Sequence, residues 1–277
     1  MRREIHERGD TVGLDPLLGP RWRWRAVVLV VVYFVLYNGL SLLLTPLATQ
    51  TDDPSSAAGI LVFYAAPILV GCLLLIGFAA SVGWLHQLFR PQPIRGRGWM
   101  WIAVAVVLLF NVLHLLSFDY GAAGTQVVAT WLLTGLFIGF AEEVLTRGLV
   151  VTLLRRAGRR EIVVAAISSA LFAALHAGNL LTGQSLPATL FQLVYTFAFG
   201  VCMYLAMRVT GTIIAPILLH ASTDPSIFLH TAYPVEGALS SLAGVGNPAV
   251  IVVGLIALFF VRGRVGRDQA APSYGAA

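Results

Sequence analysis

Long, uninterrupted apolar runs separated by short polar connections make up most of this 277-residue chain. The runs are continuous rather than alternating, so each is predicted to satisfy its own backbone hydrogen bonds as a helix, not as a strand of a barrel. A helix needs about 20 apolar residues to cross a bilayer. By that measure the pattern marks spans at residues 26–44, 57–82, 99–118, 126–154, 162–181, 186–207, 211–229 and 249–261. The predicted fold class is all-α, a polytopic transmembrane helical bundle of about eight spans.

The composition points the same way. Hydrophobic residues make up 58% of the chain and charged residues only 11%, whereas soluble domains carry about 25% charged residues. This excludes an ordinary cytosolic enzyme, a secreted disulfide scaffold and a nucleic-acid binder. The two cysteines, Cys72 and Cys202, lie inside apolar runs and are interpreted as packing residues.

The positive charge lies on one side of the predicted bundle, in alternate connections between the spans. All 18 basic residues are arginines, and every one except Arg147 lies in a tail or in the second, fourth or sixth connection. The positive-inside rule therefore predicts an even number of spans with both termini in the cytoplasm. The net charge of +5 is assigned to this topology and to contact with anionic lipid of the bilayer, not to nucleic acid. The use of arginine alone, with much Ala, Gly and Val, indicates a bacterial protein, so we expect a multi-pass protein of the bacterial plasma membrane.

Five regions follow from these patterns, and the chain has no internal repeat. They are an Arg-rich cytoplasmic tail (1–25), a three-span region (26–118), a core region (126–229), a last span (249–261) and a disordered C-terminal tail (262–277).

Ionisable side chains inside predicted spans are functional candidates, because a charge at mid-bilayer costs several kcal/mol. They form i, i+4 pairs that share a helix face: Glu143 with Arg147 after Glu142, Phe172 with His176, and His220 with Asp224. We take Arg156, Glu161 and Arg208 as markers of the cytoplasmic surface. Counted from these markers, the three motifs lie at a common depth of about 20 Å, at about 1.5 Å per residue. Residues remote in sequence are therefore expected to converge at one level of the bundle, in reach of the cytoplasmic side.

These three motifs also carry a resemblance to a known family. Glu-Glu-x-x-x-Arg, Phe-x-x-x-His and His-x-x-x-Asp, in that order on separate apolar helices, resemble the CPBP family of intramembrane proteases over about residues 126–229. That family includes the type II CAAX prenyl endopeptidases and the bacteriocin-processing and immunity proteins, also called Abi-like. Two positions depart from it: Thr146 stands where many members have an aromatic residue, and Asp224 stands where the prenyl endopeptidases have Asn.

The resemblance implies a role for each residue. Glu142 is the expected general base on a water molecule, and His176 is expected to help position or deprotonate that water. His220 with Asp224 faces the developing oxyanion. Since an ionised carboxylate has no proton to donate, Asp224 is expected to orient His220 and support its protonated form. The remaining motif residues, Glu143, Arg147 and Phe172, are expected to orient the site, and Glu143 and Arg147 are expected to form a buried ion pair.

No cofactor is expected to be required, although zinc is an open alternative. Glu142 or Glu143, His176, His220 and Asp224 include ligand types that suit zinc, and the family is often labelled as metalloproteases. The His-Glu-x-x-His helix of zincins is absent. The expected partners are the lipid bilayer and a peptide or membrane-protein substrate, prenylated or otherwise membrane-associated.

Two other functions stay open. One is a catalytically idle relative that acts as a scaffold or bacteriocin-immunity factor, and the other is a proton-coupled transporter, which the absence of a repeat disfavours. Outside the motifs, Asn111 and His114 in the third span are interpreted as a polar contact between helices.

Overall fold

The computed structural model describes residues 24–49, 51 and 53–266. Within these ranges the chain is helical, with two isolated β-bridges in place of strands, so the all-α prediction is confirmed. Most of the two predicted tails, residues 1–23 and 267–277, lies outside the described residues.

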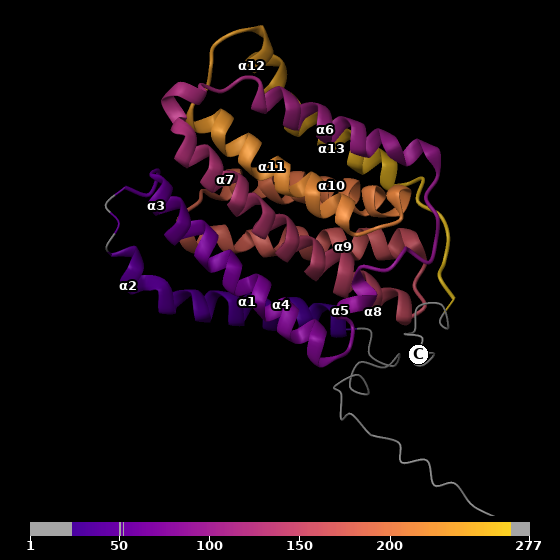
Figure 1. The fold of residues 1–277 in the computed structure, drawn as a ribbon. Helices are drawn as coiled ribbons and strands as arrows, with labels where there is room; N and C mark the ends of the chain where they lie inside the picture. Colours follow the sequence, from indigo (N-terminus) through magenta and orange to yellow (C-terminus); the bar gives the residue numbers. More distant parts are fainter. Residues whose placement is uncertain (1–23, 50, 52, 267–277) are drawn as a thin grey trace, which may run out of the picture.

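Eight long helices run back and forth through one bundle, several of them extended by short helical segments (Figure 1). In chain order the segments are α1 Arg25–Ser41 with η2 Leu42–Leu44 and α2 Thr45–Ala48; α3 Ala57–Ile60, η3 Leu61–Ala65 and α4 Ala66–Ser81; α5 Leu85–Leu88; η4 Gly98–Met100 and α6 Trp101–Leu115; α7 Tyr120–Glu143, η5 Val144–Val150 and α8 Val151–Arg156; α9 Glu161–Leu175 with η6 His176–Thr182; α10 Leu186–Thr210; α11 Ile214–Ala232; α12 Ala238–Ala243; and α13 Gly246–Leu258.

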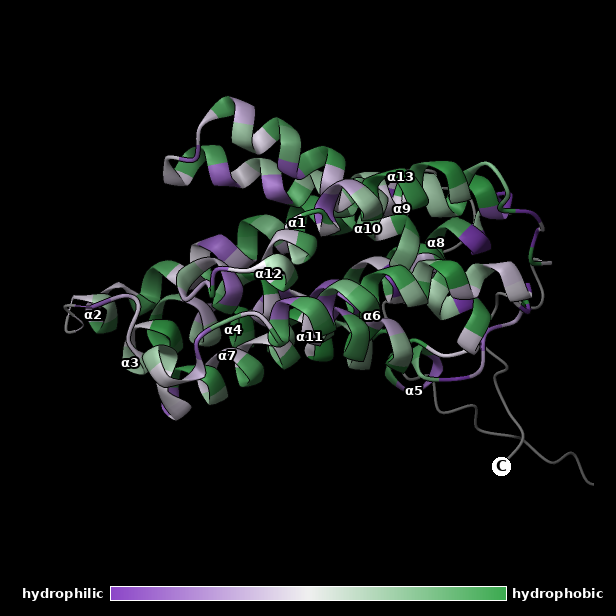
Figure 2. Cartoon of the chain, turned by 90° about the horizontal axis from the view of Figure 1, so that it is seen from above, coloured by the Kyte–Doolittle hydropathy of each residue, from purple (hydrophilic) through white to green (hydrophobic). Residues whose placement is uncertain are grey.

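Seven of the helical stretches in the described residues are long and apolar enough to cross a membrane, which confirms a polytopic membrane bundle. The predicted span at 211–229 is a helix, α11, but it is not among the seven. At 19 residues α11 is long enough. Polar side chains in its second half lower its mean hydropathy, and the same side chains point into the bundle, where α6, α7 and α10 surround the helix. Figure 2 shows hydrophobic residues along the other helices, as a lipid-facing surface requires.

The two ends of the bundle differ in charge. α5 and α8 lie at one end together with both ends of the described chain, and α2, α3 and α12 lie at the other (Figure 1). The described arginines except Arg147 belong to the first of these ends, which we call the arginine end. This arrangement agrees with the predicted alternation of the connections, while the cytoplasmic orientation of the arginine end stays a prediction.

Two of the residues taken as surface markers are not at the surface. Glu161 and Arg208 lie at the arginine end, but they are only 0% and 2% exposed. Glu161 forms ion pairs with both Arg208 and Arg155, and these pairs neutralise the buried charges. Both residues lie at the same end of the bundle, as the sequence predicts, and the cytoplasmic orientation of that end stays a prediction.

Candidate active site

Two glycines bring α7 and α11 into backbone contact. A Cβ atom added at Gly135 would lie 2.3 Å from a backbone carbonyl oxygen of α11, and one at Gly139 would lie 2.4 Å from another. Only a residue without a side chain fits at such a distance. The close approach places Glu142 and Glu143, at the end of α7, beside His220 in the middle of α11.

The chain passes from α7 into a π-helical turn, η5, directly after Glu143. Such turns occur mostly as single insertions in α-helices, frequently at functional sites. Arg147 lies in this turn, and its Nη1 is 3.3 Å from Oε1 of Glu143 with both side chains 0% exposed. The ion pair predicted between these two residues is therefore confirmed.

Glu143 has a second partner that the sequence did not indicate. Its Oε1 is also 2.8 Å from Nδ1 of His220. Since a carboxylate only accepts hydrogen bonds, this contact assigns a proton to Nδ1 and leaves Nε2 facing the other way. Glu143 thus fixes the orientation of His220 as well as pairing with Arg147.

Two phenylalanine rings enclose the imidazole of His220. The ring centroid of Phe172 lies 5.8 Å away and that of Phe199 lies 4.8 Å away, both nearly perpendicular to the imidazole. The guanidinium carbon of Arg147 lies 4.7 Å from the centre of the Phe172 ring. Phe172 therefore packs between the cation and the imidazole, and it excludes water from the back of the site.

The Nε2 side of His220 faces two carboxylates. Oε2 of Glu142 lies 3.5 Å from this nitrogen and Oδ2 of Asp224 lies 3.8 Å from it. Both distances are longer than a good hydrogen bond, and Oε2 of Glu142 has no hydrogen-bond partner among the described residues. The side chains of Glu142 and Asp224 are 21% and 27% exposed, whereas those of Glu143 and Arg147 are fully buried. The open face of the site is therefore the face that carries Glu142 and Asp224.

His176 lies where α9 changes into the tighter η6 segment. Its Nδ1 is 3.2 Å from the carbonyl oxygen of Phe172, and its ring meets the Phe172 ring edge-on at 5.0 Å. If Nδ1 donates to that carbonyl, Nε2 is free to accept a proton or a hydrogen bond. The structure links His176 to the other motif residues through Phe172.

The predicted site residues thus gather in one region where α7, η5, α9 and α11 meet. They are Glu142, Glu143, Arg147, Phe172, His176, His220 and Asp224. Their catalytic roles stay predictions, since a static arrangement does not test them.

A metal does not fit this arrangement as it stands. The described residues include no group of three or more His, Cys, Asp and Glu side chains placed to hold a metal ion. One nitrogen of His220 already contacts Glu143, and Nδ1 of His176 faces a backbone carbonyl. We therefore derive no step through a metal.

Several residues around the site were not identified from the sequence. Tyr33 of α1 lies in electrostatic range of Glu142, and Tyr195 of α10 lies in range of Asp224. Neither carries a local signal, and nor does Phe199. The spacing of Gly135 and Gly139 does carry one, because two small residues four apart are typical of close helix contacts in membranes.

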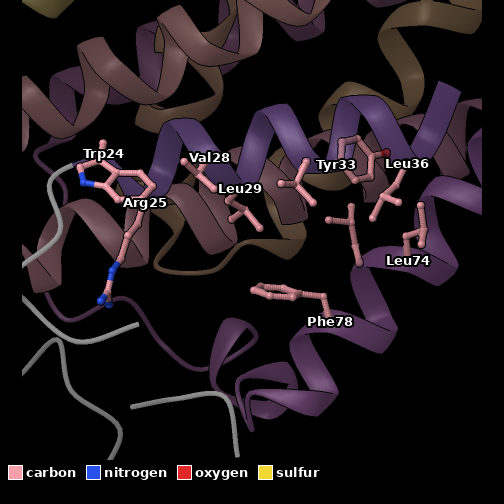
Figure 3. A pocket seen from close by; sticks show the side chains of 10 residues that line it. Trp24, Arg25, Val28, Leu29, Tyr33, Leu36, Leu74 and Phe78 are labelled. Carbon is pink, nitrogen blue, oxygen red and sulfur yellow. The ribbon is translucent and has the colours of Figure 1, made fainter. Parts of the chain in front are cut away.

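An apolar groove of about 300 Å³ follows α1 on the side that faces α4. Figure 3 shows Trp24 and Arg25 at one end of the groove, with Tyr33 and Leu36 toward the other. Leu74 and Phe78 of α4 form the opposite wall. The groove therefore runs from the arginine end toward the helix turn that carries Tyr33, the neighbour of Glu142.

Comparison with known proteins gives one match. Residues 124–226 match the family described as type II CAAX prenyl endopeptidase Rce1-like. The matched segment includes all three motifs, from Glu142 to Asp224, so the predicted resemblance to the CPBP family is confirmed. No curated protein and no solved structure matches the chain.

Proposed function

We propose that this multi-pass membrane protein, whose residues 124–226 are an Rce1-like region, is an active endopeptidase that hydrolyses peptide bonds within the membrane. At family level the region is that of a CAAX-type intramembrane endopeptidase. The observation that carries the proposal is the pair of partly exposed carboxylates, Glu142 and Asp224, which face Nε2 of His220. The other nitrogen of this imidazole, Nδ1, contacts Glu143.

The first step is the activation of water. A water molecule between Glu142 and His176 gives its proton to the Glu142 carboxylate, and the oxygen attacks the scissile carbonyl carbon. The C–O bond forms, and the carbonyl oxygen becomes an oxyanion. Glu142 then delivers the proton to the departing amide nitrogen, the C–N bond breaks, and the carboxylate is restored.

The oxyanion is stabilised by His220. Its Nδ1–H is held by Glu143, so Nε2–H of the protonated ring points to the open face. Asp224 lies beside Nε2 and supports the protonated form of the ring. The aromatic walls, Phe172 and Phe199, exclude bulk water and strengthen these interactions.

The proposed substrate is a peptide anchored in the bilayer, prenylated or carrying another apolar segment. The groove along α1 supports this, because it offers an apolar path that ends near Tyr33 and Glu142. The charge on the arginine end supports an orientation in the bacterial plasma membrane with that end in the cytoplasm.

The test is cleavage of a membrane peptide library by the protein in nanodiscs, with and without a chelator. We expect activity that survives the chelator and is lost in His176→Ala. Glu236→Gln, which changes an exposed carboxylate outside the bundle core, is the matched control and keeps full activity.

Activity that needs zinc after chelation would contradict the metal-free mechanism and return Glu142, His176 and His220 to ligand roles. A folded wild-type protein that cleaves no peptide would favour the idle scaffold, and proton flux in vesicles would favour the transporter.

A further inference from the structure

A buried network of charged and polar side chains surrounds Glu161 at the arginine end of the bundle. The carboxylate of Glu161 accepts hydrogen bonds from Arg155, Arg208 and Tyr204. The backbone amide of Glu161, at the start of α9, donates a hydrogen bond to the carbonyl oxygen of Gly263 at 3.0 Å. Hydrolysis consumes water, so the proposed reaction needs a supply of water at the site.

A small cavity lies between α6, α10, α11 and α13. Its volume is about 10 Å³, which is close to the 10–15 Å³ that one water molecule requires. The side chains that offer hydrogen bonds to it are Asn111, His114, Tyr195, Thr223 and Asn247. A water molecule needs two to four such partners, so the site is polar enough to hold one.

One of these side chains is buried with an unused polar atom. His114 is only 7% exposed, and its Nδ1 has no hydrogen-bond partner among the described residues. Asn111 is 3% exposed, and its Nδ2 lies 2.9 Å from the hydroxyls of Ser222 and Thr223, as the predicted contact between helices requires. A buried imidazole nitrogen without a partner is destabilising, and a bound water removes that cost.

Polar groups continue from the cavity in both directions. Toward the site, Thr223 lines the cavity and directly precedes Asp224 in the chain. Away from it, the imidazole of His114 lies 5.0 Å from that of His230, whose Nε2 is 2.8 Å from the hydroxyl of Ser240. Ser240 belongs to α12, at the end of the bundle opposite to α5 and α8 (Figure 1).

We propose that this cavity binds one ordered water molecule. We propose further that this water site is the innermost part of a solvent route from the α12 end of the bundle to Asp224. The water site stands without the proposed function, whereas the use of its water in hydrolysis rests on it. In this arrangement water reaches the active site from the side opposite to the arginines.

Hydroxyl-radical labelling by X-ray pulses, read by mass spectrometry, tests the site without a substrate, because radicals form where water is bound. We expect His114 and Phe110 in nanodisc-embedded protein to be modified at least about tenfold faster than Tyr204, which is fully buried in the Glu161 network. Rates equal to that of Tyr204 would overturn the proposal.

Substitution then links the labelling to the cavity. Thr223→Val keeps the volume and removes one polar partner, and Asn111→Leu removes another, so each is expected to lower the labelling of His114 by about threefold or more. Asn38→Leu, at an exposed position on α1, is the control and leaves it unchanged. Unchanged labelling in both cavity variants would contradict the assignment of the water to these groups.

Rapid mixing with ¹⁸O water before the pulse tests the route. Incorporation of the isotope at His114 within milliseconds supports exchange with solvent, and incorporation only after minutes would overturn the route. Closing the α12 end with Ser240→Trp is expected to slow the exchange without loss of helical content. Because no cleavage is measured, a failure here is distinguished from a failure of the proposed protease.

Discussion

The protein buries two glutamates beside arginines, and it satisfies them very differently. At the arginine end, both carboxylate oxygens of Glu161 accept hydrogen bonds, from Arg155, Arg208 and Tyr204. At the α7–α11 junction, Oε1 of Glu143 is shared by Arg147 and His220, while its Oε2 has no partner.

The same difference extends to the neighbours of these glutamates. Arg155 uses its third nitrogen on Gln92, at 2.7 Å. Arg147 leaves Nε and Nη2 without partners among the described residues, and so does Glu142 its Oε2. Each unsatisfied buried group costs about 1–3 kcal/mol. The carboxylate of Glu161 uses both oxygens, although Nε of Arg208 has no partner among the described residues. The unused atoms of Glu142, Glu143 and Arg147 leave hydrogen-bonding capacity for a substrate or water.

The largest expected effect is on activity. Glu142→Gln removes the proposed base and is expected to lower kcat by about 10²–10⁴-fold. Because Oε2 of Glu142 has no hydrogen-bond partner, stability should change by less than about 1 kcal/mol. Cleavage assays and unfolding in bicelles measure the two effects. A large loss of stability with intact cleavage would reverse the comparison.

The next effect is on stability alone. Glu161→Gln leaves two buried arginines without their carboxylate and is expected to lower the free energy of unfolding by about 3–5 kcal/mol. Steric trapping in bicelles measures this, with Glu236→Gln as the exposed control. The folded fraction should cleave at the wild-type rate, and a specific loss of kcat would show that Glu161 also serves the site.

Glu143→Gln is expected to affect both activity and stability, each less than the substitution above that affects it most. The amide oxygen still accepts from His220, but Arg147 loses its charge partner. We expect kcat to fall about 10–100-fold with KM unchanged, and the free energy of unfolding to fall by about 1–3 kcal/mol. A change in KM alone would argue against a positioning role on His220.

The smallest effect belongs to Tyr204→Phe. The hydroxyl is one of several donors to Glu161, so its loss should cost about 1 kcal/mol of stability. Tyr64→Phe, at an exposed position, is the paired variant, and it should leave stability unchanged within about 0.5 kcal/mol. Equal losses of stability in both variants would mean that the hydrogen bond from Tyr204 to Glu161 contributes no specific stabilisation.

Much of the fold can be predicted from the pattern of apolar residues along the chain. The apolar runs locate the long helices within a few residues, and α11 extends only three residues past the predicted limit, Leu229. Helical periodicity also predicts the pair of Glu143 with Arg147, because residues four apart share a face.

Contacts between distant helices do not follow from such patterns. The bond from Glu143 to His220 joins residues 77 positions apart and depends on the backbone contact of α7 with α11. The burial of Glu161 likewise depends on α8, α9 and α10 meeting at the arginine end. The local sequence shows only that Glu143 and Glu161 are charged residues. Whether such a charge is solvated or neutralised by a buried partner depends on how distant helices pack.

The polarity of α11 also bears on how the chain enters the membrane. This helix lies outside the set of stretches apolar enough to cross alone, and its residues His220 and Asp224 are costly to expose to lipid. Its neighbours α6, α7 and α10 all precede it in the chain, so they are already made when α11 leaves the ribosome. The order of the helices thus lets α11 insert against a partly assembled protein instead of against hydrocarbon.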